Sequence, residues 1–232
     1  MMCGRFTLTV DPADLQEAFP DFIFQVQLNQ RYNIAPGQPI LCVPNDGGKK
    51  ATFFSWGLIP SWVKPSQTGS GKDGQLQINR MINARADTLA EKPFFRSAYK
   101  NHRCLIFADG FYEWQARPGM KSKAPHYIRM KSREPFAFAG LWDRWQSSDG
   151  SEILSAAIIT TDPNDVVEKI HNRMPVILPR DAYSQWLDPA PQIPNRLQGL
   201  LIPYPASEME AFAVTPMVNS PGNDQPECIT PA

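Results

Sequence analysis

The sequence lacks the features that mark several common classes of protein. No apolar run approaches the roughly 20 residues of a membrane-spanning helix, and the N-terminus has no apolar signal-peptide segment. Lys and Arg total 23, as do Asp and Glu, so there is no broad basic surface for nucleic acid. These absences predict a cytosolic protein with no membrane contact. Any DNA site in it must depend on a few well-placed arginines.

Metal-binding cysteine motifs are also missing. The four cysteines are Cys3, Cys42, Cys104 and Cys228, and no two of them form a CxxC pair, so a zinc site of that kind is unsupported. A reducing cytosol would keep them as free thiols. Cys42 and Cys104 lie in apolar runs typical of strands and are expected in the core. The sequence therefore predicts no metal and no cofactor.

Long helical patterns are scarce. The 23 prolines are spread along the chain and most apolar runs are short, which favours strands and loops. Strands are predicted over 38–43, 51–57, 103–108, 111–115, 125–131, 135–141, 153–160, 174–178 and 211–214. Helices are predicted over 12–18, 86–91, 93–100, 163–170, 180–187 and 193–200. The sequence Asn-Asp-Gly-Gly at 45–48 predicts a hairpin turn between the first two strands.

The order of these elements indicates the fold class. The strands do not alternate with long helices, which argues against a parallel α/β sheet. We predict an α+β fold in which residues 1–232 form a single domain. Its curved, mainly antiparallel β-sheets would be barrel-like, with short peripheral helices. The segment 64–78, rich in Gly, Ser and Lys, is predicted to be a mobile surface loop.

One cysteine lies almost at the N-terminus, in Met-Met-Cys-Gly-Arg-Phe at 1–6. If both methionines were removed, the thiol and the α-amino group of Cys3 would share one carbon. Such a 1,2-aminothiol condenses with an aldehyde to an imine and then closes a thiazolidine ring. The amine titrates near ~7.7–8.0 and the thiol near ~8.5, so both are partly nucleophilic at neutral pH. The alternative is that Cys3 is an ordinary small residue of a first strand.

Two titratable residues stand out because they adjoin apolar or aromatic segments. Glu113 is flanked by Tyr112 and Trp114, so it is either an exposed strand residue or a carboxylate in an apolar pocket. The pocket would raise its pKa and suit it to proton transfer. His171 lies between a predicted short helix and a buried strand. It is either an acid–base group or a histidine at a helix C-terminus.

These residues belong to a set of ordered motifs. The set consists of Cys-Gly-Arg-Phe at 3–6, Arg-Tyr-Asn-Ile-Ala-Pro-Gly at 31–37, Trp-Gly-Leu-Ile-Pro-Ser-Trp at 56–62, Asn-Ala-Arg-Ala-Asp at 83–87, Ala-Asp-Gly-Phe-Tyr-Glu-Trp at 108–114, His-Asn-Arg-Met-Pro-Val-Ile-Leu at 171–178, Val-Thr-Pro-Met-Val-Asn at 214–219 and Pro-Glu-Cys-Ile at 226–229. Together they resemble the SOS response-associated peptidase (SRAP) family from Cys3 to about Ile229.

The resemblance implies a DNA-damage protein that senses and shields abasic sites in single-stranded DNA, including junctions with duplex. Members of the family form a thiazolidine cross-link between the N-terminal cysteine and the ring-opened deoxyribose. This lyase-like chemistry is accompanied by autocatalytic, peptidase-like removal of the residues before that cysteine. The implied location is cytoplasmic, and nucleoid-associated when the protein is bound to DNA. No protein partner is indicated.

The resemblance also implies roles for individual residues. Four of them carry the chemistry: the nucleophile Cys3, the site-contacting Asn83, Glu113 for ring opening and proton transfer, and the acid–base group His171. The others bind DNA: Arg5, Arg85 and Arg173 at phosphates, and Asn33, Pro36 and Trp62 in segments that line the DNA channel. Guanidinium groups suit phosphate, and an exposed tryptophan can stack on bases.

Three features depart from the family pattern. Met1 and Met2 both precede Cys3, where the family has one initiator methionine, and a retained methionine would block the amine. Asn172 stands where aspartate is common, and Asp87 where glutamate is common. The loop 64–78 is longer than usual.

Two other functions remain open. One is an N-terminal-nucleophile hydrolase that uses the Cys3 thiol on amide bonds. The other is a non-catalytic single-strand-binding module in which Cys3 is inert.

Overall fold

The structure is a computed structural model that describes residues 3–64, 69–70, 76–77, 81–120, 122–147 and 150–232. Met1 and Met2, whose removal is in question, lie outside these residues, as does most of the predicted loop 64–78. Within that loop the described strands β5 (Gly69–Ser70) and β6 (Leu76–Gln77) pair with each other. No described helix is long and apolar enough to cross a membrane.

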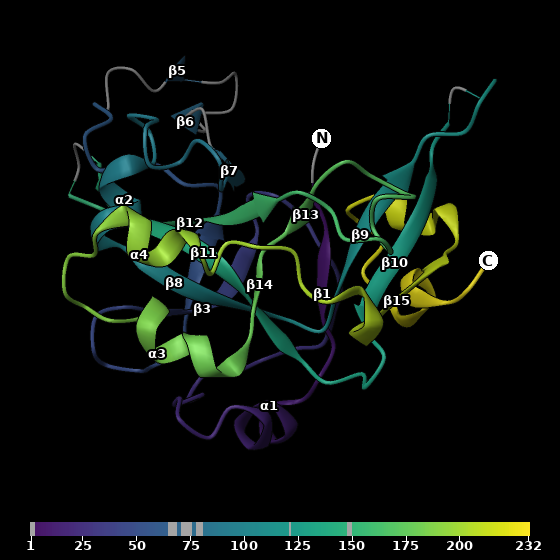
Figure 1. The fold of residues 1–232 in the computed structure, drawn as a ribbon, viewed down its shortest axis with the longest axis horizontal. Helices are drawn as coiled ribbons and strands as arrows, with labels where there is room; N and C mark the ends of the chain where they lie inside the picture. Colours follow the sequence, from purple (N-terminus) through teal and green to yellow (C-terminus); the bar gives the residue numbers. More distant parts are fainter. Residues whose placement is uncertain (1–2, 65–68, 71–75, 78–80, 121, 148–149) are drawn as a thin grey trace.

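A closed barrel of five strands forms one half of the molecule (Figure 1). Its strands are β3 (Pro39–Pro44), β4 (Thr52–Trp56), β8 (Arg103–Ala108), β11 (Phe136–Gln146) and β12 (Glu152–Thr161). In the spatial order β4-β3-β8-β11-β12 neighbouring strands pair antiparallel, and a parallel pairing between β12 and β4 closes the ring. Closure removes the free edges that an open sheet would expose.

A second sheet lies beside the barrel and is antiparallel throughout. Its order is β15 (Met209–Ala213), β10 (Ala124–Met130), β9 (Gly110–Gln115), β1 (Phe6–Leu8) and β2 (Arg31–Ile34). Phe6 of β1 packs edge-on against Trp56 and Phe138 of the barrel, with ring centroids 5.0 and 5.8 Å away. The first strand is therefore fixed between the two halves, where Figure 1 shows β1.

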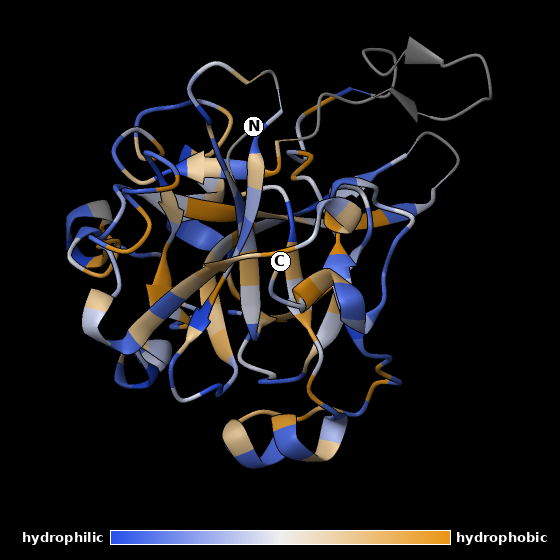
Figure 2. Ribbon diagram, turned by 90° about the vertical axis from the view of Figure 1, so that its right-hand side faces the viewer, coloured by the Kyte–Doolittle hydropathy of each residue, from blue (hydrophilic) through white to orange (hydrophobic). Residues whose placement is uncertain are grey.

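Three short strands extend the barrel where its strands end. The strand β7 (Asn83–Arg85) runs parallel to β12, β13 (Met174–Pro175) runs antiparallel to β12, and β14 (Ile177–Leu178) pairs with β11. In Figure 2 the hydrophobic residues concentrate in the strands, while most connecting loops are hydrophilic.

The helices are short and peripheral. The helix α1 (Pro12–Ala18) begins where Asp11 accepts hydrogen bonds from the Ala13 and Asp14 amides. The others are α2 (Arg96–Asn101), α3 (Tyr183–Trp186) and α4 (Pro194–Gln198), with 3-10 turns at Arg180–Ala182, Ala206–Glu208, Pro216–Asn219 and Pro226–Ile229.

The predicted α+β class, the curved and mainly antiparallel sheets, and the barrel are confirmed. So is the core position of Cys42 and Cys104, both fully buried, and all four cysteines are free thiols. The helices predicted over 86–91 and 163–170 are wrong, because both segments form turns. In the second segment the Asn164 side chain accepts the Val166 and Val167 amides as a helix N-cap would, but the chain that follows forms turns only.

Candidate functional site

Cys3, Asn83 and Glu113 come together from three distant parts of the chain. The Cys3 backbone N–H donates to Glu113 Oε1 at 2.7 Å, and Asn83 Nδ2 donates to the Cys3 carbonyl at 3.3 Å. Pairing of β1 with β9 brings Glu113 to the N-terminus, and pairing of β7 with β12 brings Asn83 there. Both polar atoms of the Cys3 backbone are thus held by side chains that the sequence motifs singled out.

The Cys3 thiol and backbone are both in unusual states. The residue is fully buried, and burial, followed by the nearby Glu113 charge, raises the pKa of its thiol well above the ordinary value. Its φ of +27° lies on the positive side, which a residue with a side chain seldom adopts. The thiol is therefore protonated at neutral pH, and a base must take its proton before it can attack.

Glu113 has the properties of a proton carrier. It is 1% exposed, and Oε2 has no hydrogen-bond partner among the described residues. Burial raises its pKa to about 7, although the Cys3 N–H pulls in the opposite direction. Of the two interpretations open from the sequence, the exposed strand residue is wrong and the buried carboxylate is confirmed.

The segment that carries His171 is joined by a hydrogen bond to the strand that carries Glu113. Gln115, two residues beyond Glu113, donates to the carbonyl of Lys169, two residues before His171, at 2.7 Å. The imidazole Nδ1 lies 3.2 Å from the Arg173 backbone nitrogen, which donates to it. Burial lowers the pKa of His171, so the ring is neutral at pH 7. The alternative of a histidine at a helix C-terminus is wrong, because no helix precedes it.

Arg85 and Arg173 meet at one carboxylate. Arg85 Nε and Nη2 donate to both oxygens of Asp87, at 3.1 and 2.7 Å, and Arg173 Nη2 reaches Asp87 Oδ1 at 3.4 Å. Arg173 also donates to Asp162 at 2.9 Å and to the Thr160 carbonyl at 2.7 Å. The two arginines lie two residues from Asn83 and His171 respectively, so a cationic pair flanks the Cys3 group.

Arg5 and Asn33 hold the C-terminal segment. Arg5 Nη1 donates to Asn33 Oδ1 and to the Val218 carbonyl, both at 2.8 Å. The Asn33 side chain is fully buried, and its amide donates to the carbonyls of Val218, Ser220 and Asn223. Asn33 therefore shapes the wall beside Arg5 through backbone contacts.

Trp62 and Pro36 lie on the surface. Trp62 is 56% exposed and meets Phe94 edge to face, with ring centroids 6.2 Å apart. Its turn is fixed by hydrogen bonds from Ser61 N to Asp143 Oδ2 at 2.8 Å and from Trp145 Nε1 to the Val63 carbonyl at 2.7 Å. Pro36 is exposed in the turn between β2 and β3.

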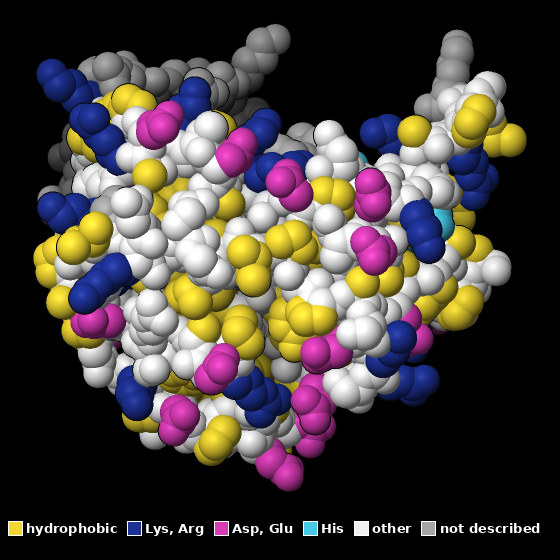
Figure 3. Space-filling model, viewed as in Figure 1, with side chains coloured by type: hydrophobic (Ala, Val, Ile, Leu, Met, Phe, Trp, Pro, Cys, Tyr) yellow, Lys and Arg dark blue, Asp and Glu magenta, His cyan; other side chains and the backbone are white. Residues whose placement is uncertain are grey.

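A cavity of about 280 Å³ opens beside Gly4, lined also by Arg5, Trp114, Lys123 and Asn219. Trp114 Nε1 donates to Asn219 Oδ1 at 2.7 Å. In Figure 3 the upper edge of the molecule is hollowed beside the β9–β10 hairpin, and both basic and acidic side chains lie around the hollow. The region offers space, positive charge and an indole ring next to the buried Cys3.

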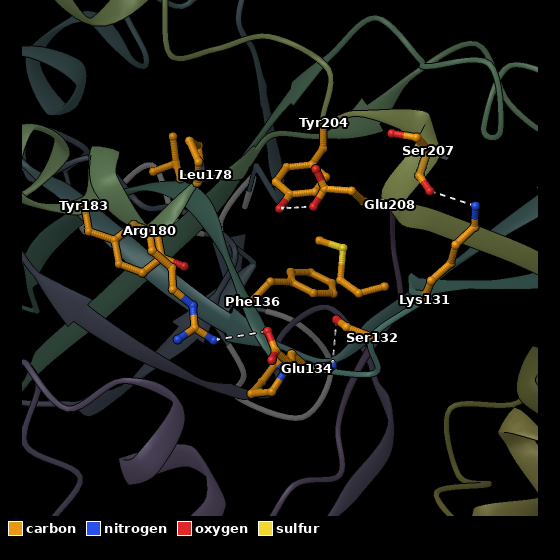
Figure 4. A pocket seen from close by; sticks show the side chains of 13 residues that line it. Lys131, Ser132, Glu134, Phe136, Leu178, Arg180, Tyr183, Tyr204, Ser207 and Glu208 are labelled. Carbon is orange, nitrogen blue, oxygen red and sulfur yellow. Dashed lines mark hydrogen bonds and ion pairs between the residues drawn. The ribbon is translucent and has the colours of Figure 1, made fainter.

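Another cavity, of about 330 Å³, is built differently. Its charged groups are already paired: Arg180 with Glu134 at 3.6 Å, Tyr204 with Glu208 at 3.2 Å and Lys131 with the Ser207 carbonyl at 2.7 Å (Figure 4). No cluster of three or more His, Cys, Asp or Glu suited to a metal occurs in the described part of the chain.

Sequence reasoning missed two residues that support the site. Asp109 is buried; it accepts from the Thr9 amide and hydroxyl at 2.5 and 2.6 Å and from the Thr7 hydroxyl at 2.5 Å, which fixes β1 beside β9. Gln115 joins β9 to the His171 segment. Both are polar residues next to predicted strands, and no local pattern reveals their distant partners.

Comparison with known proteins finds one family model and several similar sequences. A family model described as SOS response associated peptidase (SRAP) matches residues 2–221. The chain is 45% identical over 231 residues to the abasic site processing protein YoqW of Bacillus subtilis, covering 98% of this chain and 99% of YoqW. It is 31% identical to the abasic site processing protein HMCES of Gallus gallus, covering 99% of this chain and 78% of that protein.

Solved structures with a similar fold are also found. A crystal structure of a protein from Bacteroides thetaiotaomicron superimposes with a TM-score of 0.84 at 27% identity, covering 99% of this chain and 100% of that one. A phage-related protein of Bordetella bronchiseptica gives a TM-score of 0.69 at 29% identity, covering 91% and 94%. The ordered motifs, the fold and these relatives together establish that the chain belongs to the SRAP family.

Proposed function

We propose that this protein processes abasic sites in single-stranded DNA, by forming a thiazolidine between Cys3 and the ring-opened sugar. The observation that carries the proposal is the 2.7 Å contact between the Cys3 nitrogen and a buried Glu113 carboxylate whose pKa is about 7. Once the preceding residues are removed, that nitrogen is the α-amine. The names of the relatives, which are abasic site processing proteins, support the same substrate.

The covalent steps balance without an oxidant or reductant. An abasic sugar is mainly a closed hemiacetal, so proton transfer at its ring oxygen must first release the C1′ aldehyde. The Cys3 amine adds to C1′, and loss of one water gives an imine. The thiol then adds to the same carbon as its proton passes to a base, which closes the thiazolidine. A group with a pKa near 7 can donate and accept these protons at neutral pH.

The other residues take roles that their positions allow. Asn83 orients the Cys3 carbonyl. His171, neutral because burial lowers its pKa, serves as the second acid–base group. Arg5, Arg85 and Arg173 bind phosphates. Trp62 stacks on a base, and Pro36 lies on the channel wall.

Removal of the residues before Cys3 belongs to the same proposal. The Cys3 thiol passes its proton to Glu113 as its sulfur attacks the Met2 carbonyl carbon, the C–N bond breaks, and the leaving nitrogen takes that proton from Glu113. Water then hydrolyses the thioester and restores the thiol. The positive φ of Cys3 places conformational strain next to this bond.

A direct experiment incubates the protein with an abasic single-stranded oligonucleotide, after intact mass has established that the chain begins at Cys3. A heat-stable adduct on a denaturing gel is expected. Cys3→Ala should bind the oligonucleotide but give no adduct, whereas Cys228→Ala, which removes another buried thiol, should cross-link normally.

The two alternative functions give different results in this experiment. Turnover of an amide substrate without an adduct would indicate an N-terminal-nucleophile hydrolase. Reversible DNA binding that is unchanged in Cys3→Ala, again without an adduct, would indicate a simple binding module. Either outcome would overturn the proposed chemistry.

A further inference from the structure

Asp87 binds Arg85 with the two-point geometry that a phosphate would use. Two parallel N–H···O bonds, of 3.1 and 2.7 Å, join the guanidinium fork to both carboxylate oxygens. Guanidinium groups bind the oxygens of phosphate with the same two-point geometry. The Asp87 carboxylate therefore occupies the edge of Arg85 that an incoming DNA phosphate would need.

The fold places Arg173 at the same carboxylate. Thr160 of β12 lies opposite Arg85 on one side and opposite Pro175 on the other. Because the two flanking strands end together, Arg173 Nη2 comes within 3.4 Å of Asp87 Oδ1. The Asp87 carboxylate thus contacts both guanidinium groups, while Asp162 contacts Arg173 alone.

Arg173 also has a donor to spare. Its side chain is 7% exposed, and the buried Nε has no hydrogen-bond partner among the described residues. Arg85 and Asp87, with side chains 53% and 47% exposed, are open to solvent. A buried guanidinium with an unused N–H beside an accessible ion pair is suited to receive a further anionic oxygen.

We propose that Asp87 is a displaceable stand-in for a DNA phosphate, which covers Arg85 and Arg173 in the free protein and gives way when single-stranded DNA binds. The inference rests on the proposed function, because it takes DNA to be the ligand. Asp87 then lowers affinity for any polyanion that offers charge alone. A strand that also engages the Cys3 site and the Trp62 ring makes enough other contacts to displace it.

The ion pair persists at neutral pH. The hydrogen bond from Arg85 holds the Asp87 pKa below its ordinary value, so protonation does not release the arginines. The neighbouring Asp162 differs, because it contacts Arg173 and has a side chain that is 82% exposed. Asp162 therefore provides a matched control: the same loss of one charge nearby, without uncovering Arg85.

The test measures reversible binding of an intact, lesion-free single-stranded oligonucleotide by fluorescence anisotropy, in wild type, Asp87→Asn and Asp162→Asn. Asp87→Asn should lower the Kd for this oligonucleotide by about fivefold or more. Asp162→Asn should lower it by about twofold or less. Equal effects of the two variants, or weaker binding by Asp87→Asn, would overturn the inference. Weaker binding would mean that Asp87 orients Arg85 for DNA.

A second measurement is independent of affinity. In a crystal structure with bound single-stranded DNA, a phosphate oxygen should replace Asp87 at Arg85 Nε and Nη2. Retention of both Asp87 contacts would refute the stand-in role. Failure of the underlying function is distinguishable, because wild type would then form no adduct with abasic DNA, whereas failure of this inference alone leaves adduct formation intact.

Discussion

The two oxygens of the Glu113 carboxylate have different surroundings. That difference determines the effect of the residue on the stability of the fold and its ability to transfer protons. Oε1 accepts the Cys3 N–H, while Oε2 is buried without a partner among the described residues. A charged oxygen in that position lacks solvation, which is why the pKa rises to about 7. The residue is useful as a proton carrier because its ionised form is unstable where it lies.

This raised pKa predicts a stability effect with a definite sign. The unfolded chain loses the Glu113 proton near pH 4.5, but the folded protein keeps it to about pH 7. The folded state binds more protons in between, so stability falls as pH rises through this range, by about 3 kcal/mol in total. Glu113→Gln removes the titration, so the variant should gain stability relative to wild type between pH 5 and pH 8.

Thermal unfolding at the two pH values checks this prediction. The Tm difference between Glu113→Gln and wild type should be about 5–10 °C more favourable at pH 8 than at pH 5. Glu91→Gln, at an exposed position, should show no such change. The prediction fails if the difference for Glu113→Gln is the same at both pH values. The variant should also form the adduct slowly, since it cannot exchange a proton at Cys3.

Among the elements, β1 is only three residues long, so its position depends on its partners. Gly110 of β9 lies opposite Thr7 of β1, and the Tyr127 hydroxyl of β10 lies 2.9 Å from the Thr7 hydroxyl. A Cβ at Gly110 would lie 2.1 Å from Tyr127 Oη. The glycine thus allows the close approach of three strands that sets Cys3 against Glu113.

Gly110→Ala should therefore destabilise the protein by about 1–3 kcal/mol, because the buried Tyr127 ring cannot move away without losing its contacts. Denaturant unfolding measures the effect. Gly199→Ala is the matched control, since a Cβ there meets nothing within 4 Å and the φ is −64°, and it should change stability by less than about 1 kcal/mol. Similar results for the two variants would contradict the role given to Gly110.

The sequence predicted the long strands well and the short ones poorly. The strands β8, β11 and β12 carry apolar runs that local pattern reveals. The strands β1, β2 and β7 have only three or four residues and include Asn33, Asn83 and Arg85. Their pairing comes from neighbours far along the chain, so no local signal marks them.

The candidate site likewise has parts that the sequence predicted and parts that it did not. The motifs identified Cys3, Asn83 and Glu113, which the fold brings into contact, and the buried state of Glu113 was one of two interpretations left open. The shared carboxylate of Asp87 and the support from Asp109 could not be predicted, because each joins residues whose proximity depends on how β12 and β9 pair. The DNA contacts and the catalytic roles remain predictions.

At the scale of the whole molecule, one buried arginine joins the barrel to the helices around it. Arg103 of β8 is fully buried and donates to the carbonyls of Tyr99, Lys100, Trp186, Asp188 and Ala190. These carbonyls belong to the end of α2, to the last residue of α3 and to the segment that follows it. A planar group with five donors can satisfy them together, and an ammonium group cannot.

Arg103→Lys should therefore lower the free energy of unfolding by about 3 kcal/mol or more, since it leaves several buried carbonyls unpaired. The corresponding fall in Tm is about 6–12 °C. Arg144→Lys serves as a control, because Arg144 is 58% exposed and its pair with Glu152 is 3.6 Å long, and it should change stability by less than about 0.5 kcal/mol. A small effect in both variants would contradict the importance of Arg103.

The separation in sequence between Cys3 and its partners also determines how long the newly made N-terminus lacks its contacts during synthesis. Glu113 follows Cys3 by 110 residues, and the Val218 carbonyl follows Arg5 by 213. At about 5–20 residues per second, a ribosome needs about 5–20 seconds to reach Glu113 after making Cys3. Throughout that interval the N-terminus has neither its carboxylate nor its walls. The chain end therefore stays open during synthesis, and the protein closes over the Cys3 thiol only as synthesis finishes.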